Sequence, residues 1–315
     1  MNSFYKLQNE DTIQSIKDFN QKCTGCNQCE CLMMKELDIN MKEFTKKISD
    51  SSFHKAEAFS CVDCGQCNLN CNVGLDVRNV FTSIKADVSC QVENNKVFNT
   101  PYILQKRVNT KHNIVKPNSK LVFMSGCSLK MSYPHLVDKT FKILKNYDNE
   151  IEMYDGCCTK PVKLLGKKQL HEEYLKQYKE KFKDTTIITA CFSCTKILKN
   201  HVNVVSVYDY MNEHNLIKDN NKQIFNSVKF PCHIDEKNIN MCKDVCKKIG
   251  IQTEVYDNVC CGSGGLIGLT NIKLSQKYKN ESVSNLQTND VICFCAECAR
   301  KLRKDKKTRH FLELI

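Results

Sequence analysis

The pattern of apolar and polar residues changes character near residue 120. Before that point, apolar residues recur at helical spacing, as in Ile13, Ile16 and Phe19, and this spacing predicts amphipathic helices. Further helices are expected over 35–49, 52–60 and 75–90. No segment in this part has a convincing strand pattern, so it is predicted to be mostly helical.

After residue 120, short apolar runs alternate with longer amphipathic stretches. This order predicts strands separated by helices, which is typical of a parallel α/β sheet. Strands are expected at 121–124, 151–154, 186–190, 228–230, 251–256 and 290–294, and helices at 134–146, 166–182, 236–249 and 271–286. Since the same order occurs twice, we predict a duplicated α/β domain.

The pattern therefore predicts a multidomain chain. A polar stretch with Pro101 and Pro117 separates the two parts and is typical of a linker. The predicted organisation is a helical domain at 1–95, a linker at 96–118, a first repeat at 119–222 and a second repeat at 223–315.

The cysteines support the duplication. Each repeat has a lone cysteine, then an adjacent pair, then a C-x2-C pair, and equivalent members lie 103 to 105 residues apart. The two sets are Cys127, Cys157, Cys158, Cys191 and Cys194, and Cys232, Cys260, Cys261, Cys295 and Cys298. Five thiolates are one more than a tetrahedral zinc or a cubane cluster needs. Adjacent cysteines point in different directions, which favours a larger cluster or a bridging thiolate.

The N-terminal part has two further cysteine runs: Cys61, Cys64, Cys67 and Cys71, and Cys23, Cys26, Cys29 and Cys31. The first shows the C-x2-C-x2-C-x3-C spacing of ferredoxin-type [4Fe–4S] sites, in which the fourth cysteine binds the other cluster. On that pattern Cys71 completes the first cubane, with Cys23, Cys26 and Cys29. Cys31 completes the second, with Cys61, Cys64 and Cys67. A pair of zinc sites is the alternative.

The two cysteine runs depart from that pattern in two ways. Leu32 and Asn72 stand where a proline is usual after the fourth cysteine. Cys31 follows Cys29 by only two residues, and two residues span at most about 7 Å. We therefore hypothesise that the cluster at Cys61, Cys64 and Cys67 is labile or contains three irons.

The composition favours metal or redox chemistry over a disulfide-bonded secreted protein and over nucleic-acid binding. The chain has 22 cysteines in 315 residues, no secretion signal and no run of 18 apolar residues, so metal or redox chemistry in the cytoplasm is favoured over disulfides. The formal charge of +12 counts every thiol as neutral, whereas cluster thiolates offset much of it. Nucleic acid is therefore not predicted as a partner. The basic run 300–309 is interpreted as a solvated helix face, with docking of an acidic redox partner as the alternative.

Local motifs in the repeats resemble a known family. Gly126-Cys127 with Tyr133-Pro134, Pro231-Cys232-His233, Thr189-Ala190-Cys191 and Cys260-Cys261-Gly262 are similar to the CCG domains of the B and D subunits of heterodisulfide reductase. Similar domains occur in the iron–sulfur subunits of glycolate oxidase and of anaerobic glycerol-3-phosphate dehydrogenase. The resemblance implies one or two noncubane [4Fe–4S] clusters at the CCG sets, in addition to the two cubanes. The main departure is Thr159 at the family's glycine position, which makes the second set the favoured working centre.

Candidate roles follow for residues near the second set. Cys260 and Cys261, with His233 as a proton donor, are the candidate catalytic residues; a structural hydrogen bond is the alternative for His233. Gly262, Gly264 and Gly265 miss the G-x-G-x-x-G spacing of a dinucleotide loop. We expect them to allow close approach of the backbone to the cluster.

The resemblance implies an iron–sulfur oxidoreductase subunit that passes electrons from the cubanes to the CCG clusters, for reduction of a disulfide. The alternative is an electron-transfer subunit of a flavin-dependent hydroxy-acid dehydrogenase, acting on glycolate, lactate or glycerol-3-phosphate, without its own substrate site. A flavoprotein or another electron-donor subunit is the expected partner, and a small thiol or disulfide the expected substrate. A zinc-stabilised binding module is a third hypothesis.

Overall fold

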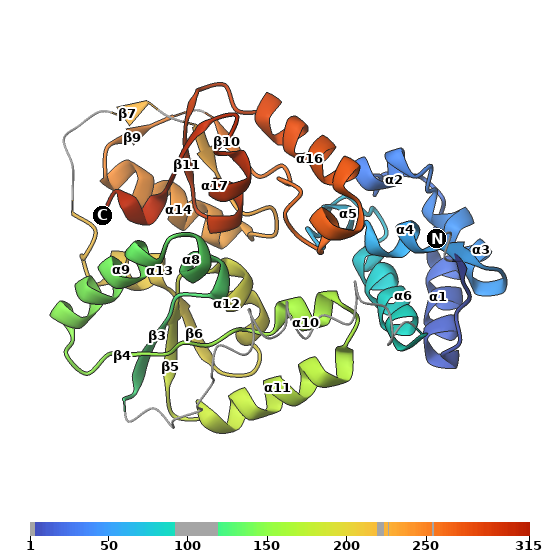
Figure 1. The fold of residues 1–315 in the computed structure, drawn as a ribbon, viewed down its shortest axis with the longest axis horizontal. Coiled ribbons are helices and arrows are strands. Elements are labelled where there is room, and N and C mark those ends of the chain that lie inside the picture. Colours follow the sequence, from blue (N-terminus) through green and yellow to red (C-terminus); the bar gives the residue numbers. More distant parts are fainter. Residues whose placement is uncertain (1–3, 92–118, 219–223, 226, 254) are drawn as a thin grey trace. The chain divides into compact units, whose positions relative to one another are not determined.

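The computed structural model describes residues 4–91, 119–218, 224–225, 227–253 and 255–315 (Figure 1). These residues form two compact units. The first contains residues up to 91 together with 161–170 and 262–280, and the second contains the described parts of 119–160, 171–261 and 281–315. The predicted linker at 96–118 lies outside the described residues.

The N-terminal part of the first unit is mostly helical, as the pattern predicts. Its helices are α1 (Glu10–Lys22), α2 (Leu32–Glu36), α3 (Met41–Asp50), α4 (Lys55–Phe59), α5 (Gln66–Leu69) and α6 (Val77–Gln91). Helix α1 buries Ile16 and Phe19 and packs against α3 and α6. Asn9 and Asn40 cap α1 and α3 by accepting backbone hydrogen bonds, as expected for short polar side chains at helix starts.

One expectation for this part was wrong. Two short strands, β1 (Phe4–Tyr5) and β2 (Phe53–His54), pair in antiparallel register. Each has only two residues, which is too short to leave an alternating pattern in the sequence.

The first unit also takes two segments from the repeats. They carry most of α10 (Lys160–Leu164), all of α15 (Ile267–Thr270) and the larger part of α16 (Ile272–Ser284). Thr270 Oγ1 donates to the carbonyl of Phe59 at 3.0 Å, and Asn271 Nδ2 donates to Ser60 Oγ at 3.1 Å. The chain that follows each cysteine doublet therefore belongs to the unit that holds the N-terminal cysteines.

The second unit contains two parallel sheets of four strands with equivalent order, β4-β3-β5-β6 and β10-β8-β11-β12. The first sheet has β3 (Leu121–Met124), β4 (Glu152–Met153), β5 (Thr186–Thr189) and β6 (Asn203–Ser206). The second has β8 (Ser227–Lys229), β10 (Tyr256–Asp257), β11 (Asp290–Cys293) and β12 (Lys307–His310). This agreement confirms the duplicated α/β fold.

The structure adds detail that the pattern did not predict. The expected strand at 251–256 is two strands, because β9 (Ile251–Gln252) pairs with β7 (Ile224–Phe225) in a separate sheet. The last strand of each four-stranded sheet, β6 and β12, was not predicted. The helices of this unit are α8 (Cys127–Ser132), α9 (Pro134–Tyr147), α11 (Lys168–Lys181), α12 (Phe192–Leu198), α13 (Val207–Glu213), α14 (Glu236–Lys248), α17 (Ala296–Leu302) and the short 3₁₀ helix η1 (Phe311–Glu313).

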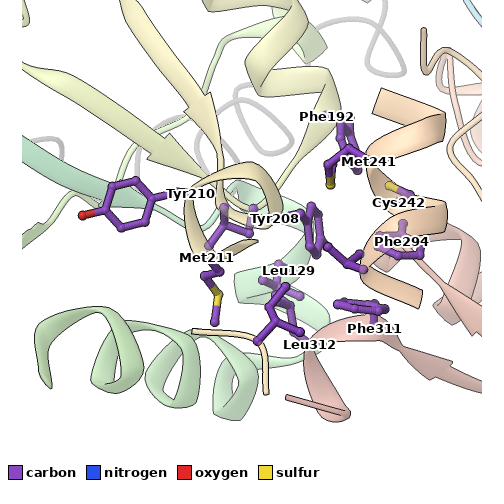
Figure 2. Close-up of a cluster of buried hydrophobic side chains, with 14 of the residues drawn as sticks. Leu129, Phe192, Tyr208, Tyr210, Met211, Met241, Cys242, Phe294, Phe311 and Leu312 are labelled. Atoms are coloured by element: carbon purple, nitrogen blue, oxygen red, sulfur yellow. The ribbon is translucent and has the colours of Figure 1, made fainter. Parts of the chain in front are cut away.

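The two repeats share one hydrophobic core (Figure 2). Tyr208 of the first repeat stacks on Phe192 and meets Phe294 and Phe311 of the second repeat edge to face, with centroids 5.1 and 5.7 Å away. Such aromatic contacts stabilise beyond the area that they bury. Cys242 of α14 lies in the same core. Within the described parts of the chain, no helix has the length and apolar character needed to span a membrane.

Candidate metal centres

One pocket of the first unit is lined by four cysteines, Cys23, Cys26, Cys29 and Cys71. The loop between α1 and α2 supplies the first three, and the chain after α5 supplies the fourth. Leu75 N donates a hydrogen bond to Cys71 Sγ at 3.3 Å, and N–H donors of this kind favour a thiolate. Burial raises the pKa of Cys29 to about 11.

A second pocket of the same unit is lined by Cys31, Cys61, Cys64 and Cys67. Cys31 precedes α2 with an extended backbone (φ −126°, ψ 171°), so the short spacing from Cys29 still lets the two side chains face different pockets. The eight thiols are thus divided in the way that crossed ligation predicts. Burial raises the pKa of Cys61 to about 11 and that of Cys67 further.

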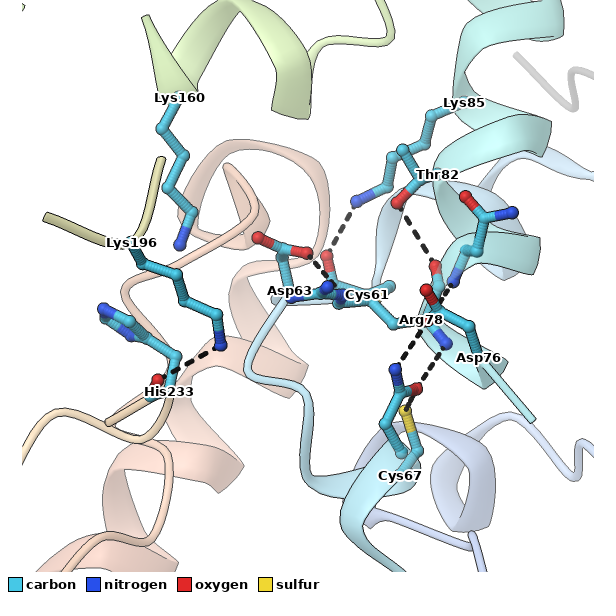
Figure 3. Close-up of polar contacts among 12 residues, drawn as sticks. Cys61, Asp63, Cys67, Asp76, Arg78, Thr82, Lys85, Lys160, Lys196 and His233 are labelled. Carbon is cyan, nitrogen blue, oxygen red and sulfur yellow. Dashed lines mark hydrogen bonds and ion pairs between the residues drawn. The ribbon is translucent and has the colours of Figure 1, made fainter. Parts of the chain in front are cut away.

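The loop of the second pocket is held by its neighbours (Figure 3). Lys85 Nζ donates to the carbonyl of Cys61 at 2.8 Å, and the Arg78 guanidinium lies 3.6 Å from the Asp63 carboxylate. Tyr278, from α16, accepts a hydrogen bond from Met33 N at 3.1 Å and also bonds to the Cys31 thiol. Tyr278 is a residue of the pocket that sequence reasoning missed, because nothing local connects α16 with residues 31–33.

The glycines after the second doublet lie close to another part of the backbone, and the expected approach to a cluster stays a prediction. A Cβ on Gly264 would lie 2.4 Å from the carbonyl oxygen of Val62, and a Cβ on Gly265 would lie 2.2 Å from that of Cys61. Both distances are well inside van der Waals contact, so only glycine fits at these positions. In the structure these glycines therefore lie against the backbone of the Cys61–Cys67 loop.

All five thiols of the first set lie together in the second unit. Hydrogen bonds join Cys157 to Cys127 and Cys158, Cys158 to Cys194, and Cys194 to Cys191. These bonds raise the pKa of Cys157 and Cys194 and lower that of Cys158 and Cys191. The set is assembled from the carboxyl ends of β3 and β5 and the chain after β4, which is where parallel α/β folds place ligand sites.

Thr159 is accommodated in the first set despite its side chain. Its φ of 58° matches the 70° of Gly262 in the second repeat, so both doublets end in a left-handed residue. This conformation costs a β-branched residue about 1–2 kcal/mol. Thr159 Oγ1 donates to the carbonyl of Cys158 at 2.8 Å and lies 2.7 Å from His171 Nδ1, and these contacts offset part of that cost.

At Gly262 there is no such room. A Cβ there would lie 2.6 Å from the carbonyl oxygen of Ser275 and 2.7 Å from the Cβ of Tyr278. Ser275 Oγ instead donates to the carbonyl of Gly262 at 2.8 Å. The difference between threonine and glycine at this position therefore follows from the packing of the next helix.

Three thiols of the second set lie together in the same way. Cys261 Sγ and Cys298 Sγ lie 3.3 Å apart, and Cys298 is also hydrogen-bonded to Cys295. Cys260 is buried, and Cys232 is half-buried. The thiols lie after β8, β10 and β11, the strands equivalent to those that position the first set.

His233 and Lys160 lie beside the first set, around a serine. His233 Nε2 is 2.8 Å from Ser193 Oγ, and Lys160 Nζ is 3.5 Å from the same oxygen. Ser193 lies between Cys191 and Cys194 in the chain, and Lys196 donates to the backbone carbonyl of His233 (Figure 3). The imidazole thus has the structural hydrogen bond that was the alternative to proton donation.

The donor chemistry fits iron–sulfur clusters. Thiolates are the ligands that iron–sulfur clusters take, and no described cysteine forms a disulfide. In the described ranges, no three Cys, His, Asp or Glu side chains converge closely enough to hold a single metal ion. Cys242 and Cys246 are fully buried on α14, as expected for small apolar residues.

Comparisons with known proteins agree with this chemistry. The model of the cysteine-rich (CCG) domain family matches residues 121–199 and 230–303. A fumarate reductase (CoM/CoB) subunit from Methanothermobacter marburgensis is 23% identical over 228 residues, covering 63% of this chain and 46% of that protein. An uncharacterized iron–sulfur protein of Methanococcus maripaludis is 20% identical over 310 residues, covering 92% of this chain and 58% of that protein. The chain thus spans about half the length of the curated relatives it matches.

Proposed function

Since the chain belongs to the family of cysteine-rich CCG proteins and carries two such domains in tandem, we propose that it is an iron–sulfur electron-transfer subunit of an oxidoreductase. The observation that carries this proposal is the grouping of thiols. Four line each of two pockets, five lie together in the first set, and Cys261, Cys295 and Cys298 lie together in the second. Similarity to a protein named as a reductase subunit and to one named as an iron–sulfur protein supports it.

The proposed ligands follow that grouping. One cubane is assigned to Cys23, Cys26, Cys29 and Cys71, and the other to Cys31, Cys61, Cys64 and Cys67, in a ferredoxin-type domain at 1–95. Noncubane clusters are assigned to the five-thiol sets of the repeats at 119–222 and 223–315. Bound iron–sulfur clusters accept and donate single electrons.

The chain's own residues prepare these sites. Burial keeps the thiols of Cys29, Cys61 and Cys67 protonated at neutral pH, so they must release protons to bind metal. The Tyr278 hydroxyl and the Lys85 ammonium fix the positions of Cys31 and Cys61.

More specifically, we propose that the protein reduces a disulfide at the second set, where Cys260 and Cys261 would face the substrate. This proposal rests on the resemblance to heterodisulfide reductase subunits. It includes a cytoplasmic location and a partner subunit that donates electrons. The name of the Methanothermobacter relative, a reductase subunit, supports a partner.

Ligand binding to the reduced and oxidised protein tests this proposal. We expect anaerobically purified protein to be brown, to bleach with dithionite, and to change its CCG electron paramagnetic resonance (EPR) signal when a small thiol is added. A colourless protein with stoichiometric zinc would contradict the proposal. A brown protein whose signals ignore thiols would restrict it to electron transfer without a substrate of its own.

A further inference from the structure

A buried ion pair lies beside the second five-thiol set, and no sequence motif indicates it. Lys229 and Asp257 are 1% and 6% exposed. Lys229 Nζ donates to the Asp257 carboxylate and to the carbonyl of Val259. The two residues are register partners at the ends of the parallel strands β8 and β10. Burying two charges is costly before they pair, and the pairing of Lys229 with Asp257 offsets that cost.

The position of the pair connects it with the thiols. Lys229 and Asp257 precede Cys232 and Cys260 by three residues each, and Lys229 also pairs across the sheet with Cys293. Burial alone would lower the pKa of Lys229, but Cys298, Asp257 and Cys261 together raise it. Paired with the Asp257 carboxylate, the Lys229 ammonium is a cation whose charge interacts with two thiols of the second set.

The Lys229 ammonium has more influence on the pKa of the Cys293 thiol than the Asp257 carboxylate does. Burial is the largest effect on Cys293 and raises its pKa. Among the charges of the pair, the lowering effect of Lys229 on that pKa is larger than the raising effect of Asp257. At Cys293, the β11 residue that pairs in register with Lys229, the ammonium therefore acts more strongly than the carboxylate.

The first repeat has no such pair at these positions, which both lie in the described ranges. Met124 and Tyr154 occupy the places of Lys229 and Asp257. Met124 is fully buried and accepts a long hydrogen bond, 3.7 Å, from the Tyr178 hydroxyl. The two sheets have equivalent order, so the exchange of a charged pair for a neutral one occurs at matching places.

Other cations do not cancel this difference. Lys160 interacts with Cys158 of the first set, and Arg300 interacts with Cys261 of the second. Lys160 is half-buried and Arg300 is exposed, so water and salt screen both charges. Each set thus has an outer cation that solvent reaches, whereas Lys229 beside the second set is buried.

Resting on the proposed function, we propose that the Lys229–Asp257 pair raises the reduction potential of the cluster held by the second set above that of the first. A buried positive charge stabilises the more negative, reduced state of a nearby cluster. One electron leaves a reduced N-terminal cubane, or dithionite in the test, and one electron is gained at the second set. Lys229 keeps its proton throughout. Electrons that enter the chain therefore accumulate at the cluster of the second set in preference to that of the first.

Exchange of the pair tests the proposal. Lys229→Met with Asp257→Tyr gives the second repeat the residues of the first, and Lys229→Gln with Asp257→Asn keeps the shapes without the charges. Neither leaves one buried charge without its partner. The midpoint potential of the second set is measured by EPR-monitored titration with dithionite. A background with Cys157→Ser and Cys158→Ser identifies its signal.

We expect both exchanges to lower the equilibrium constant for reduction of the second set at least tenfold, which is about 59 mV for one electron. The matched control Arg300→Gln removes an exposed cation and is expected to change it less than threefold. Full iron content with an unchanged or raised potential in both exchanges would overturn the proposal, as would loss of iron from both. Absence of a cluster at the second set of the unsubstituted chain would instead overturn the proposed function.

Discussion

Gly264 and Gly265 show how a single-residue requirement can depend on a distant segment. The motif predicts that the backbone approaches the cluster of the second set closely at these glycines. The structure shows that they meet the peptide of Cys61 and Val62, about 200 residues earlier in the chain. The need for glycine at these positions could be inferred from the motif. The segment that the glycines contact could not, because that contact depends on long-range packing.

The first prediction concerns these glycines. Gly265→Ala places a Cβ 2.2 Å from a backbone oxygen at a φ of 62°, so we expect the free energy of unfolding to fall by roughly 2 kcal/mol or more. Gly268→Ala is the matched control, since it lies in α15 with no atom within 4 Å of its Cβ position. Gly268→Ala is expected to raise the free energy of unfolding by up to about 1 kcal/mol. Chemical denaturation measures both, and equal effects would contradict the packing described.

The second prediction concerns the crossed ligands. Cys31→Ser is expected to alter the same EPR signal as Cys64→Ser, and Cys71→Ser the same signal as Cys26→Ser, because each pair lines one pocket. Because the backbone at Cys31 is extended, its side chain reaches the second pocket despite the short spacing from Cys29. If Cys31→Ser and Cys26→Ser change one common signal, the assignment of the fourth ligands is wrong.

At the scale of elements, one strand that sequence reasoning missed is a polar strand at the edge of its sheet. The strand β12 reads Lys-Thr-Arg-His and has no apolar residue, yet it pairs with β11 along four residues. It ends the order of its sheet, and an edge strand needs less apolar surface than a central one. The basic run 300–309 is accordingly not one helix face, because it is divided between α17, a turn and β12.

The third prediction uses the end of β12. His310 is 1% exposed, and its Nδ1 accepts a hydrogen bond from Leu312 N at 3.3 Å. Burial lowers the pKa of His310 to about 3, so the folded chain binds fewer protons there than the unfolded chain. Its contribution to stability is complete above about pH 6.5 and is lost as the pH falls toward 3, by about 1.4 kcal/mol per pH unit.

Substitution of this histidine isolates its contribution. His310→Asn keeps an acceptor for the cap but cannot titrate, so its free energy of unfolding should fall less between about pH 6.5 and 5 than that of the unsubstituted protein. His54→Asn is the control, because His54 caps α4 in the same way but is only half-buried. Parallel pH profiles for His310→Asn and the unsubstituted protein would show that the imidazole is not held neutral.

At the scale of the whole molecule, the duplication could be predicted from cysteine spacing and strand order. Two features could not. One is the shared core, in which Tyr208 of one repeat packs on Phe294 and Phe311 of the other. The second is the inclusion of 161–170 and 262–280 in the unit of the N-terminal cysteines. Both depend on contacts between residues far apart in the chain, which no local pattern records.

The fourth prediction tests the shared core. The Tyr208 hydroxyl is buried and has no hydrogen-bond partner among the described residues. Tyr208→Phe removes this unpaired group, so stability should stay constant or rise by up to about 1 kcal/mol. Tyr208→Ala should lower it by about 3–5 kcal/mol. In calorimetry Tyr208→Ala should shift the unfolding of both repeats together, and a shift of only one repeat would contradict a common core.

Iron quantitation with a cysteine substitution in each group tests the central claim most directly. If the four thiol groups hold four clusters, anaerobically loaded protein should contain about 16 iron atoms per chain. Serine at Cys26, Cys64, Cys158 or Cys261 should each remove or alter one cluster and leave the others. Iron well below that value in fully loaded protein, or a substitution that abolishes no distinct signal, would contradict the account.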